Sequence, residues 1–223
     1  MRWTIEVAGG EVPIVADDDA GASVVILAHG AASNMDTKTQ EWLSGLLRRA
    51  GFSVIRFNFL YSAKGGTLPD RMPVLKQTYR AVVESVCTKI SPKVLIIGGH
   101  SMGGRVASML MADDSIADAL LLFGYPLHPT GKPEELRSAH LPSIKTPTLQ
   151  FSGTNDHLCT PELMNDVVST LRPGLWALHW LEGADHGYAL RKSSGRTRAD
   201  LEEEIVGALL SWKASFQQAP SVT

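Results

Sequence analysis

The sequence has few cysteines, no excess of either charge and no long apolar run. Its 223 residues include 21 lysines and arginines against 23 aspartates and glutamates, which gives a net charge of -2. Because there is neither a broad basic surface nor a polybasic run, we expect it to bind neither nucleic acid nor an anionic membrane. A small or neutral molecule is the expected partner.

Only two cysteines are present, Cys87 in a predicted helix and Cys159 in a predicted loop. Two cysteines make a poor disulfide framework, which indicates reduced thiols. Residues 1–6 lead straight into alternating residues, with no positively charged start followed by an apolar stretch of signal-peptide length, and no apolar run reaches transmembrane length. These absences predict a cytoplasmic protein.

Spacings typical of metal and nucleotide sites are also missing. No pair of histidine, cysteine or carboxylate residues shows a ligand spacing such as H-E-x-x-H. A phosphate loop would need a lysine and a hydroxyl after its last glycine, where this sequence has Gly104 and Arg105. We therefore expect no metal and no cofactor.

Apolar strand-like runs alternate with helical patterns along the chain. A chain of 223 residues with 44% hydrophobic residues suits one well-filled α/β core, so we expect a single domain over residues 1–223, with a frayed tail at 217–223. The alternation favours a parallel sheet covered on both faces. Strands are predicted at 3–7, 12–16, 23–28, 52–59, from 94, at 119–123, 147–152 and 175–181, and helices at 40–50, from 73, at 105–112, from 160 and at 201–216, with a loop at 61–71.

The most informative stretch is Val94 to Gly104, an apolar strand that stops at a serine flanked by glycines. It contains the pattern G-x-S-x-G of a nucleophile elbow, in which the serine occupies a strained turn between a strand and a helix. Residues two before and two after such a serine approach neighbouring backbone so closely that a Cβ would clash, which explains Gly99 and Gly103. A glycine-rich turn with an incidental serine is the alternative. The strand before and the helix after favour Ser101 as a nucleophile.

A serine hydroxyl needs a base and an orienting acid. His186 follows the last predicted strand in a glycine-flanked loop, and Asp156 follows the strand before it, in the chain order serine, acid, histidine. Asp156 would fix the tautomer of the imidazole. Asp185 is the rival acid, but adjacent residues usually point their side chains apart. His100 should point away from the serine hydroxyl.

An oxyanion hole needs two backbone donors, one after the nucleophile and one in the loop after an early strand. The N–H groups of Met102 and Ala31 fill those places, and each would contribute about 3 kcal/mol of transition-state stabilisation. Gly30 is expected to permit the backbone conformation that aims Ala31. His29 could support the same loop.

Taken together, His29-Gly30, Gly99 to Gly103, Asp156 and His186 resemble the α/β-hydrolase superfamily over roughly residues 24–188. The resemblance implies an α/β-hydrolase fold, a mostly parallel eight-stranded sheet whose first pair is antiparallel, with helices on both faces. Residues 56–59, 98–105 and 124–133 are similar to small capless members related to dienelactone hydrolases and to testis-expressed and histone-acetyltransferase-complex hydrolase-like proteins.

The segment 124–146 lies between two predicted strands, where a cap domain would be inserted, and it is too short to form one. An open site without a cap is therefore expected. Loop residues near the strand ends are candidates to line this site. They are Leu60, Tyr61, Tyr125, Leu127, His128 and Lys132.

The predicted function is a serine hydrolase that cleaves a small-molecule carboxylic ester through an acyl-enzyme, with thioesters and lactones less favoured. The alternative is a hydrolase-like interaction module whose triad survives without turnover. Perhydrolase chemistry would use the same residues, so the sequence does not separate it from esterase activity.

Overall fold

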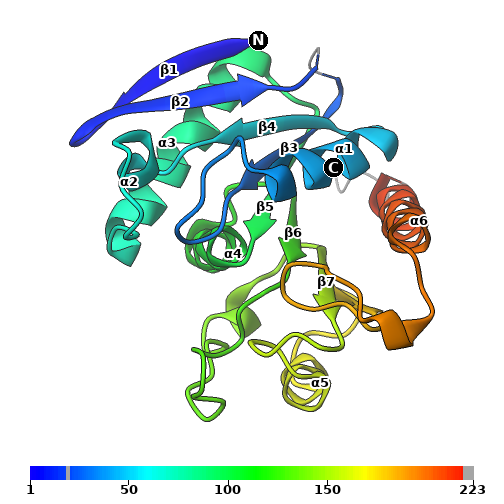
Figure 1. Cartoon of the computed structure of the whole chain (residues 1–223). Coiled ribbons are helices and arrows are strands. Elements are labelled where there is room, and N and C mark those ends of the chain that lie inside the picture. Colours follow the sequence, from blue (N-terminus) through cyan, green and yellow to red (C-terminus); the bar gives the residue numbers. More distant parts are fainter. Residues whose placement is uncertain (19–20, 218–223) are drawn as a thin grey trace.

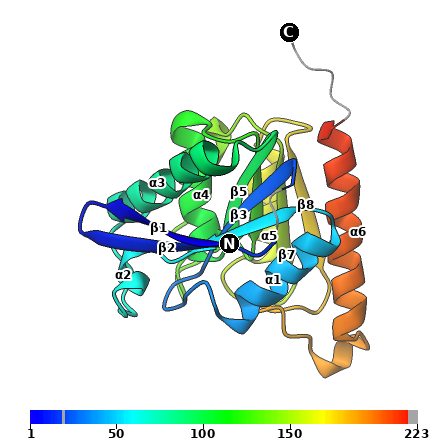
Figure 2. The ribbon, with the colours of Figure 1, turned by 90° about the horizontal axis from the view of Figure 1, so that it is seen from above.

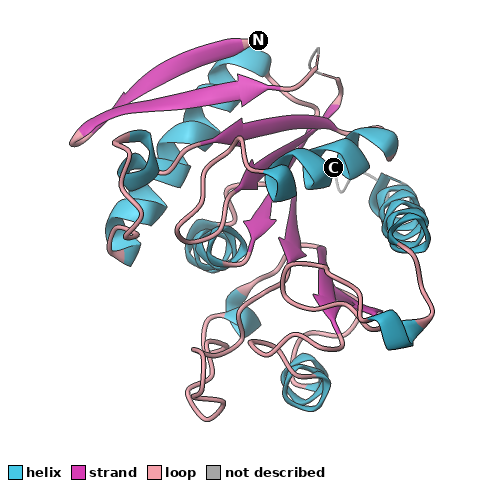
Figure 3. Ribbon diagram, viewed as in Figure 1, coloured by secondary structure: helices cyan, strands magenta, loops and turns pink. Residues whose placement is uncertain are grey.

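The computed structural model describes residues 1–18 and 21–217, and it contains one eight-stranded sheet between two layers of helices (Figures 1 and 3). The strand order is β1-β2-β4-β3-β5-β6-β7-β8. β1 pairs with β2 and β2 with β4 in antiparallel fashion, and all other pairs are parallel. The strands are β1 (Arg2–Val7), β2 (Gly10–Ala16), β3 (Ser23–Ala28), β4 (Ser53–Phe57), β5 (Val94–His100), β6 (Ala119–Phe123), β7 (Thr148–Gly153) and β8 (Trp176–Leu181).

Helices cover both faces of the sheet (Figure 2). One buried cluster joins the sheet to α3, α4 and α5, and a second cluster joins the opposite face to α1 and α6. The helices are α1 (Lys38–Arg49), α2 (Leu60–Ala63), α3 (Met72–Ile90), α4 (Met102–Asp114), α5 (Pro161–Ser169) and α6 (Arg198–Gln217), with 3-10 turns η1 (Leu141–Ser143) and η2 (Lys192–Ser194). Of the predicted tail at 217–223, Gln217 ends α6 and the rest lies outside the described residues.

This architecture confirms the predicted α/β-hydrolase fold. The central strands are buried on both faces, which is why they read as continuous apolar runs rather than alternating ones. The segment between β6 and β7 contains only the short turn η1, so it forms no cap. No helix within the described residues is long and apolar enough to cross a membrane.

The predicted loop at 61–71 is wrong at its start, where the single-turn helix α2 begins at Leu60. Leu60 and Tyr61 are buried, each with 5% of its surface exposed. A helix of four residues is too short to show the periodicity by which sequence patterns reveal helices. The glycine-rich residues that follow it account for the rest of the predicted loop.

Arg56 on β4 forms a buried ion pair with Asp17, which follows β2, and also contacts the loop after β3. Arg56 on β4 donates from Nε and Nη2 to both carboxylate oxygens of Asp17, at 2.6 Å each, and from Nη1 to the carbonyl of Met35. Ser44 Oγ donates to the same carboxylate at 2.5 Å. Burial alone would raise the pKa of Asp17, but the bonds from Arg56 and Ser44 and the charges of Arg56 and Arg48 outweigh it and lower that pKa below 3.8. The loop is thereby anchored through Met35.

Asp17→Asn should destabilise the fold by about 3 kcal/mol or more, because it leaves the Arg56 guanidinium buried beside a neutral partner. A depressed folded-state pKa also makes the contribution of Asp17 pH dependent. Its stabilisation is present above the unfolded value of 3.8 and is lost as pH falls through the lower folded value. Urea unfolding between pH 7 and pH 2 measures both effects.

Asp36→Asn is the matched control for this prediction. Asp36 pairs with the same Arg56 at 3.7 Å, but its side chain is 49% exposed. Exposed pairs contribute at most about 1 kcal/mol. Equal losses in the two variants would contradict the importance of the buried pair.

Candidate active site

The loops that follow the parallel strands meet at one edge of the sheet. In the order β3-β5-β6-β7-β8, the strand before Ser101 lies next to the strand before Ala31, and β7 and β8 lead to Asp156 and His186. Ligand sites of open α/β sheets form at the carboxyl ends of the strands. The topology alone therefore brings the predicted residues to a common edge.

Ser101 lies in a strained turn between β5 and α4. Its φ of 53° and ψ of -118° are unusual for a residue with a side chain, and it occupies the N-cap position of α4. A Cβ on either Gly99 or Gly103 would lie 2.5 Å from the carbonyl oxygen of Ala28. The two glycines are thus required by backbone contact, as the sequence predicts.

The structure brings Ser101, His186 and Asp156 together in one chain of hydrogen bonds. His186 Nε2 lies 2.9 Å from Ser101 Oγ, and His186 Nδ1 lies 2.8 Å from Asp156 Oδ2. A carboxylate can only accept, so Nδ1 carries the hydrogen and Nε2 is left to accept from the serine hydroxyl. The His186 side chain is 19% exposed, whereas the Asp156 side chain is fully buried. This geometry is the one that the predicted roles of nucleophile, base and orienting acid require.

Two contacts hold the loops of the acid and the base against each other. The N–H of Asn155 donates to the carbonyl of Ala184 at 2.9 Å, and the N–H of Gly183 donates to Thr154 Oγ1 at 2.9 Å. A Cβ on Gly153 would lie 2.1 Å from the same Ala184 carbonyl. The glycine at the end of β7 therefore permits the close approach that sets Asp156 beside His186.

Asp185, the rival acid, is engaged elsewhere. Its Oδ1 accepts from the N–H groups of Gly187 and Ala189, both at 2.9 Å. These bonds close the turn that follows His186. Asp185 shapes the loop of the base, and Asp156 supplies the carboxylate that the imidazole contacts.

The peptide between Gly30 and Ala31 is held from its carbonyl side. His29 Nδ1 lies 2.8 Å from the Gly30 oxygen, and the Tyr61 hydroxyl donates to that oxygen at 3.3 Å. His29 Nε2 accepts from the N–H of Phe59, so Nδ1 is the donor. Burial, partly offset by the bond to Gly30, lowers the pKa of His29 to about 4, and the ring is neutral at pH 7. In a planar trans peptide the N–H points opposite to the C=O, so the Ala31 N–H is aimed away from these donors.

Met102, the other predicted donor, is the first residue of α4. Its N–H therefore has no partner within the helix and is free to face a bound anion.

The expectation that Gly30 supplies a special backbone conformation needs correction. The φ of Gly30 lies outside the left-handed region, whereas Ala32 has a φ of 51°. Gly30 instead lies close to the elbow, where a Cβ would be 3.5 Å from the Cβ of Ser101.

The six residues predicted to line the site do not form a solvent-accessible surface beside Ser101. Leu60, Tyr61, Tyr125, Leu127 and His128 are each 5% exposed or less, and Lys132 is an exposed residue paired with Glu135 at 2.6 Å. Leu60, Tyr61, Tyr125 and Leu127 instead pack into the core cluster on the face covered by α3 and α4. The sequence pattern identifies the loops but not the side chains that face the substrate.

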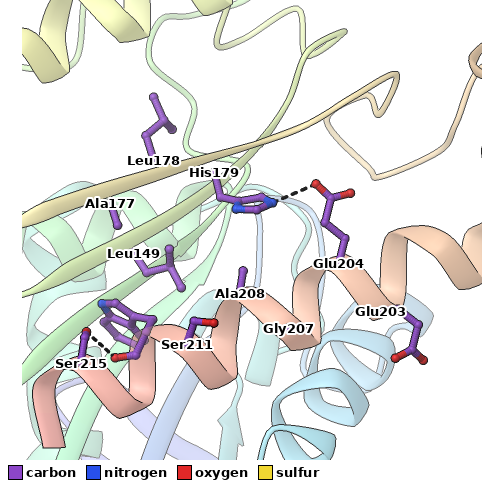
Figure 4. A pocket seen from close by; sticks show the side chains of 11 residues that line it. Leu149, Ala177, Leu178, His179, Glu203, Glu204, Gly207, Ala208, Ser211 and Ser215 are labelled. Carbon is purple, nitrogen blue, oxygen red and sulfur yellow. Dashed lines mark hydrogen bonds and ion pairs between the residues drawn. The ribbon is translucent and has the colours of Figure 1, made fainter. Parts of the chain in front are cut away.

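A separate hollow lies between β8 and α6, on the face that α6 covers (Figure 4). Small residues of α6, such as Gly207 and Ser211, border it, and His179 Nε2 contacts Glu204 Oε1 at 2.9 Å across one end. None of the residues lining it belongs to the Ser101, His186 and Asp156 chain. It is a surface groove distinct from the candidate site.

Sequence reasoning names Tyr61 as a lining residue and His100 as pointing away from the serine hydroxyl, but it misses the contacts that the two side chains make. Tyr61 holds the Gly30 carbonyl, and His100 contacts the carbonyl of His186 at 3.0 Å. No local pattern could identify them, because each contact joins loops that follow different strands. Within the described part of the chain, no group of three or more histidine, cysteine or carboxylate residues is placed to hold a metal ion.

A serine at a strand-to-helix elbow, on a mostly parallel sheet of eight strands without a cap, defines the class of α/β serine hydrolases. The chain belongs to the family described as an alpha/beta hydrolase domain, whose model matches residues 21–214.

Solved structures share this fold at low sequence identity. An α/β serine hydrolase without a lid from Xanthomonas campestris is 19% identical, with a TM-score of 0.74 over 100% of this chain and 96% of that one. A serine hydrolase homologue from Coxiella burnetii is 18% identical, with a TM-score of 0.74 over 95% and 96%. A dienelactone hydrolase from Anabaena variabilis is 17% identical, with a TM-score of 0.71 over 96% of both chains. These likenesses agree with the fold and with the absence of a cap.

Proposed function

We propose that the protein is a serine hydrolase that cleaves carboxylic esters of small molecules through an acyl-enzyme. The observation that carries the proposal is the His186 ring, which contacts Ser101 Oγ through one nitrogen and Asp156 Oδ2 through the other. A hydroxyl bonded to a base that a buried carboxylate orients is the arrangement that activates serine.

In the first half of the reaction, Ser101 Oγ attacks the carbonyl carbon of the ester while His186 Nε2 takes the hydroxyl proton. The C–O bond to the alcohol then breaks, and His186 returns the proton to the departing oxygen. Asp156 stabilises the imidazolium that forms between these steps. In the second half, water attacks the acyl carbon while His186 Nε2 takes a proton from it, the bond between that carbon and Ser101 Oγ breaks, and His186 returns the proton to Oγ as the acid leaves.

The oxyanion that forms in each half would be bound by the N–H groups of Ala31 and Met102. The first is oriented by the bonds that His29 and Tyr61 make to the Gly30 carbonyl. The second belongs to the first turn of α4, whose N-terminus favours negative charge. Both donors are fixed before substrate arrives, so they require no reorganisation during the reaction.

Labelling with a fluorophosphonate probe, together with hydrolysis of a short-chain p-nitrophenyl ester, tests the proposal. Labelling at Ser101 with turnover of the ester supports it. A folded protein that neither reacts with the probe nor hydrolyses the ester contradicts it and favours the interaction module. Labelling without ester turnover directs the search to thioesters and lactones, which use the same residues.

Tyr61→Phe should lower kcat about tenfold with little change in KM. The substitution removes one of the two donors that hold the Gly30 carbonyl, so the Ala31 N–H is less firmly aimed, and a complete loss of one donor costs about a hundredfold or more. Steady-state kinetics on the p-nitrophenyl ester measure the change.

Tyr125→Phe is the matched control. The Tyr125 hydroxyl also donates to a backbone carbonyl, that of Arg137 at 2.6 Å, but not within the oxyanion loop. Each variant should lose about 1 kcal/mol of stability. If both lower kcat equally, the loss reflects general stability and not the oxyanion loop.

A further inference from the structure

His100 is a half-buried histidine next to the nucleophile that the proposed mechanism does not use. It ends β5, and its ring is directed away from the serine hydroxyl, as the sequence predicts. Its Nε2 lies 3.0 Å from the carbonyl oxygen of His186, so the residue before the nucleophile contacts the main chain of the base. The two imidazole rings have centroids 5.2 Å apart.

The ring of His100 lies where the loops after three strands meet. A Cβ on Gly30, after β3, would be 3.4 Å from its Nδ1, and a Cβ on Gly124, after β6, would be 3.4 Å from its Nε2. Tyr188, in the loop after β8, has its ring centroid 6.0 Å away. The same Cβ on Gly124 would be 3.3 Å from the His186 oxygen, so the contact between His100 and His186 is enclosed.

The direction of the hydrogen bond between His100 and the His186 carbonyl follows from the chemistry of its two atoms. A carbonyl oxygen only accepts, so His100 Nε2 must carry the hydrogen. Burial lowers the pKa of His100 to about 4, and the nearby charges of His186 and Asp156 act on it in opposite directions. The ring is therefore neutral in the pH range where His186 would act as a base, and it supplies a donor without adding a charge beside the imidazolium.

The loop that carries His186 needs such a contact because its backbone is strained. Tyr188 has a φ of 66°, which is unusual for an aromatic residue. Asp185 holds the turn from within the loop, through the N–H groups of Gly187 and Ala189. His100 is the contact that joins the main chain of His186 to the elbow strand itself.

We propose that His100 is a positioning residue, whose bond to the His186 carbonyl fixes the base over Ser101 and against Asp156. The inference rests on the proposed function of Ser101, His186 and Asp156. A base displaced by about 1 Å can cost a hundredfold in rate. Without this bond the elbow and the base would be linked only through their own hydrogen bond and through the packing around them.

His100→Leu removes the donor, and His100→Gln keeps an N–H at about the same reach. We expect kcat of the leucine variant to fall between about tenfold and a hundredfold while KM changes less than about twofold. The glutamine variant should recover most of the loss. His100→Asn, whose amide is too short to reach, provides a second variant without the bond if the leucine variant is unstable, and thermal unfolding shows which variants are folded.

A merely structural role would not change the following spectroscopic signal. The low-field proton NMR signal of the His186 imidazole bonded to Asp156 should be present in the wild type and the glutamine variant, and be lost or exchange-broadened in the leucine variant.

His157→Leu is the matched control, because His157 is exposed and its ring lies 6.1 Å from that of His186 without a bond to the backbone of the base. Equal loss in His157→Leu and His100→Leu, equal loss in the leucine and glutamine variants, or an unchanged imidazole signal in the leucine variant would each overturn the proposal. If the wild type hydrolyses no ester, the proposed function fails, but the NMR signal still decides the role of His100.

Discussion

Ser101→Ala should reduce kcat for ester hydrolysis by about a millionfold, to a rate close to background, and should abolish fluorophosphonate labelling. The effect is the largest expected for this protein because the serine oxygen forms the covalent intermediate, and removal of a triad serine costs about this much. His186→Ala should be nearly as severe, since the two residues act as one unit. A double variant should be no worse than either single one.

Folding is not at risk in Ser101→Ala, which keeps the Cβ and removes only an oxygen. The strained backbone at Ser101 is set by the close contacts of Gly99 and Gly103, and these remain. Thermal unfolding should therefore show an unchanged or slightly higher Tm, because strained functional sites are often costly to stability. If Ser101→Ala retained activity within tenfold of the wild type, another nucleophile would be responsible and the proposed mechanism would be wrong.

Asp156→Asn should lower kcat about ten-thousandfold, because an amide in place of the carboxylate favours the wrong tautomer of the imidazole and no longer stabilises the imidazolium. The side chain is fully buried and also accepts from the N–H of Leu158 at 2.8 Å through its other oxygen. Asparagine has the same shape, so the fold should survive. Single-turnover labelling with the fluorophosphonate probe and steady-state kinetics should show the same loss.

Asp185→Asn makes the same substitution at the rival carboxylate and is the matched control for Asp156→Asn. It removes the same charge one residue from the base, but the residue closes a turn and does not contact the imidazole. An amide oxygen can still accept those two bonds, so we expect kcat to change less than about tenfold. If Asp185→Asn were the more damaging substitution, the assignment of the orienting acid would have to be reversed.

The sequence predicts the parts of the site whose chemistry is local. Gly99 and Gly103 indicate the elbow because backbone contact permits no Cβ there. Asp156 and His186 can be found because each follows a predicted strand and, in a parallel sheet, the ends of such strands meet at one edge. Chain order and strand ends are both visible in the sequence.

The parts that could not be predicted depend on how loops pack against one another. Tyr125 and Leu127 follow a strand as catalytic residues do, yet they are fully buried in the core. Tyr61 belongs to a single-turn helix and acts on a loop 31 residues away in sequence. Side-chain direction in a loop is set by such tertiary contacts, and periodicity carries no information about it.

The residues of the site are spread along most of the chain, and Ser101 and His186 are 85 residues apart. His186, the proposed base, lies beyond β8 at the far edge of the sheet, so a chain still being synthesised contains its serine well before His186 can reach it. Pairing of β8 must precede activity, because the loop that carries His186 follows that strand. Hydrolytic activity would thus appear only in chains in which β8 has paired with β7. The onset of ester cleavage during refolding would therefore report when β8 joins the sheet.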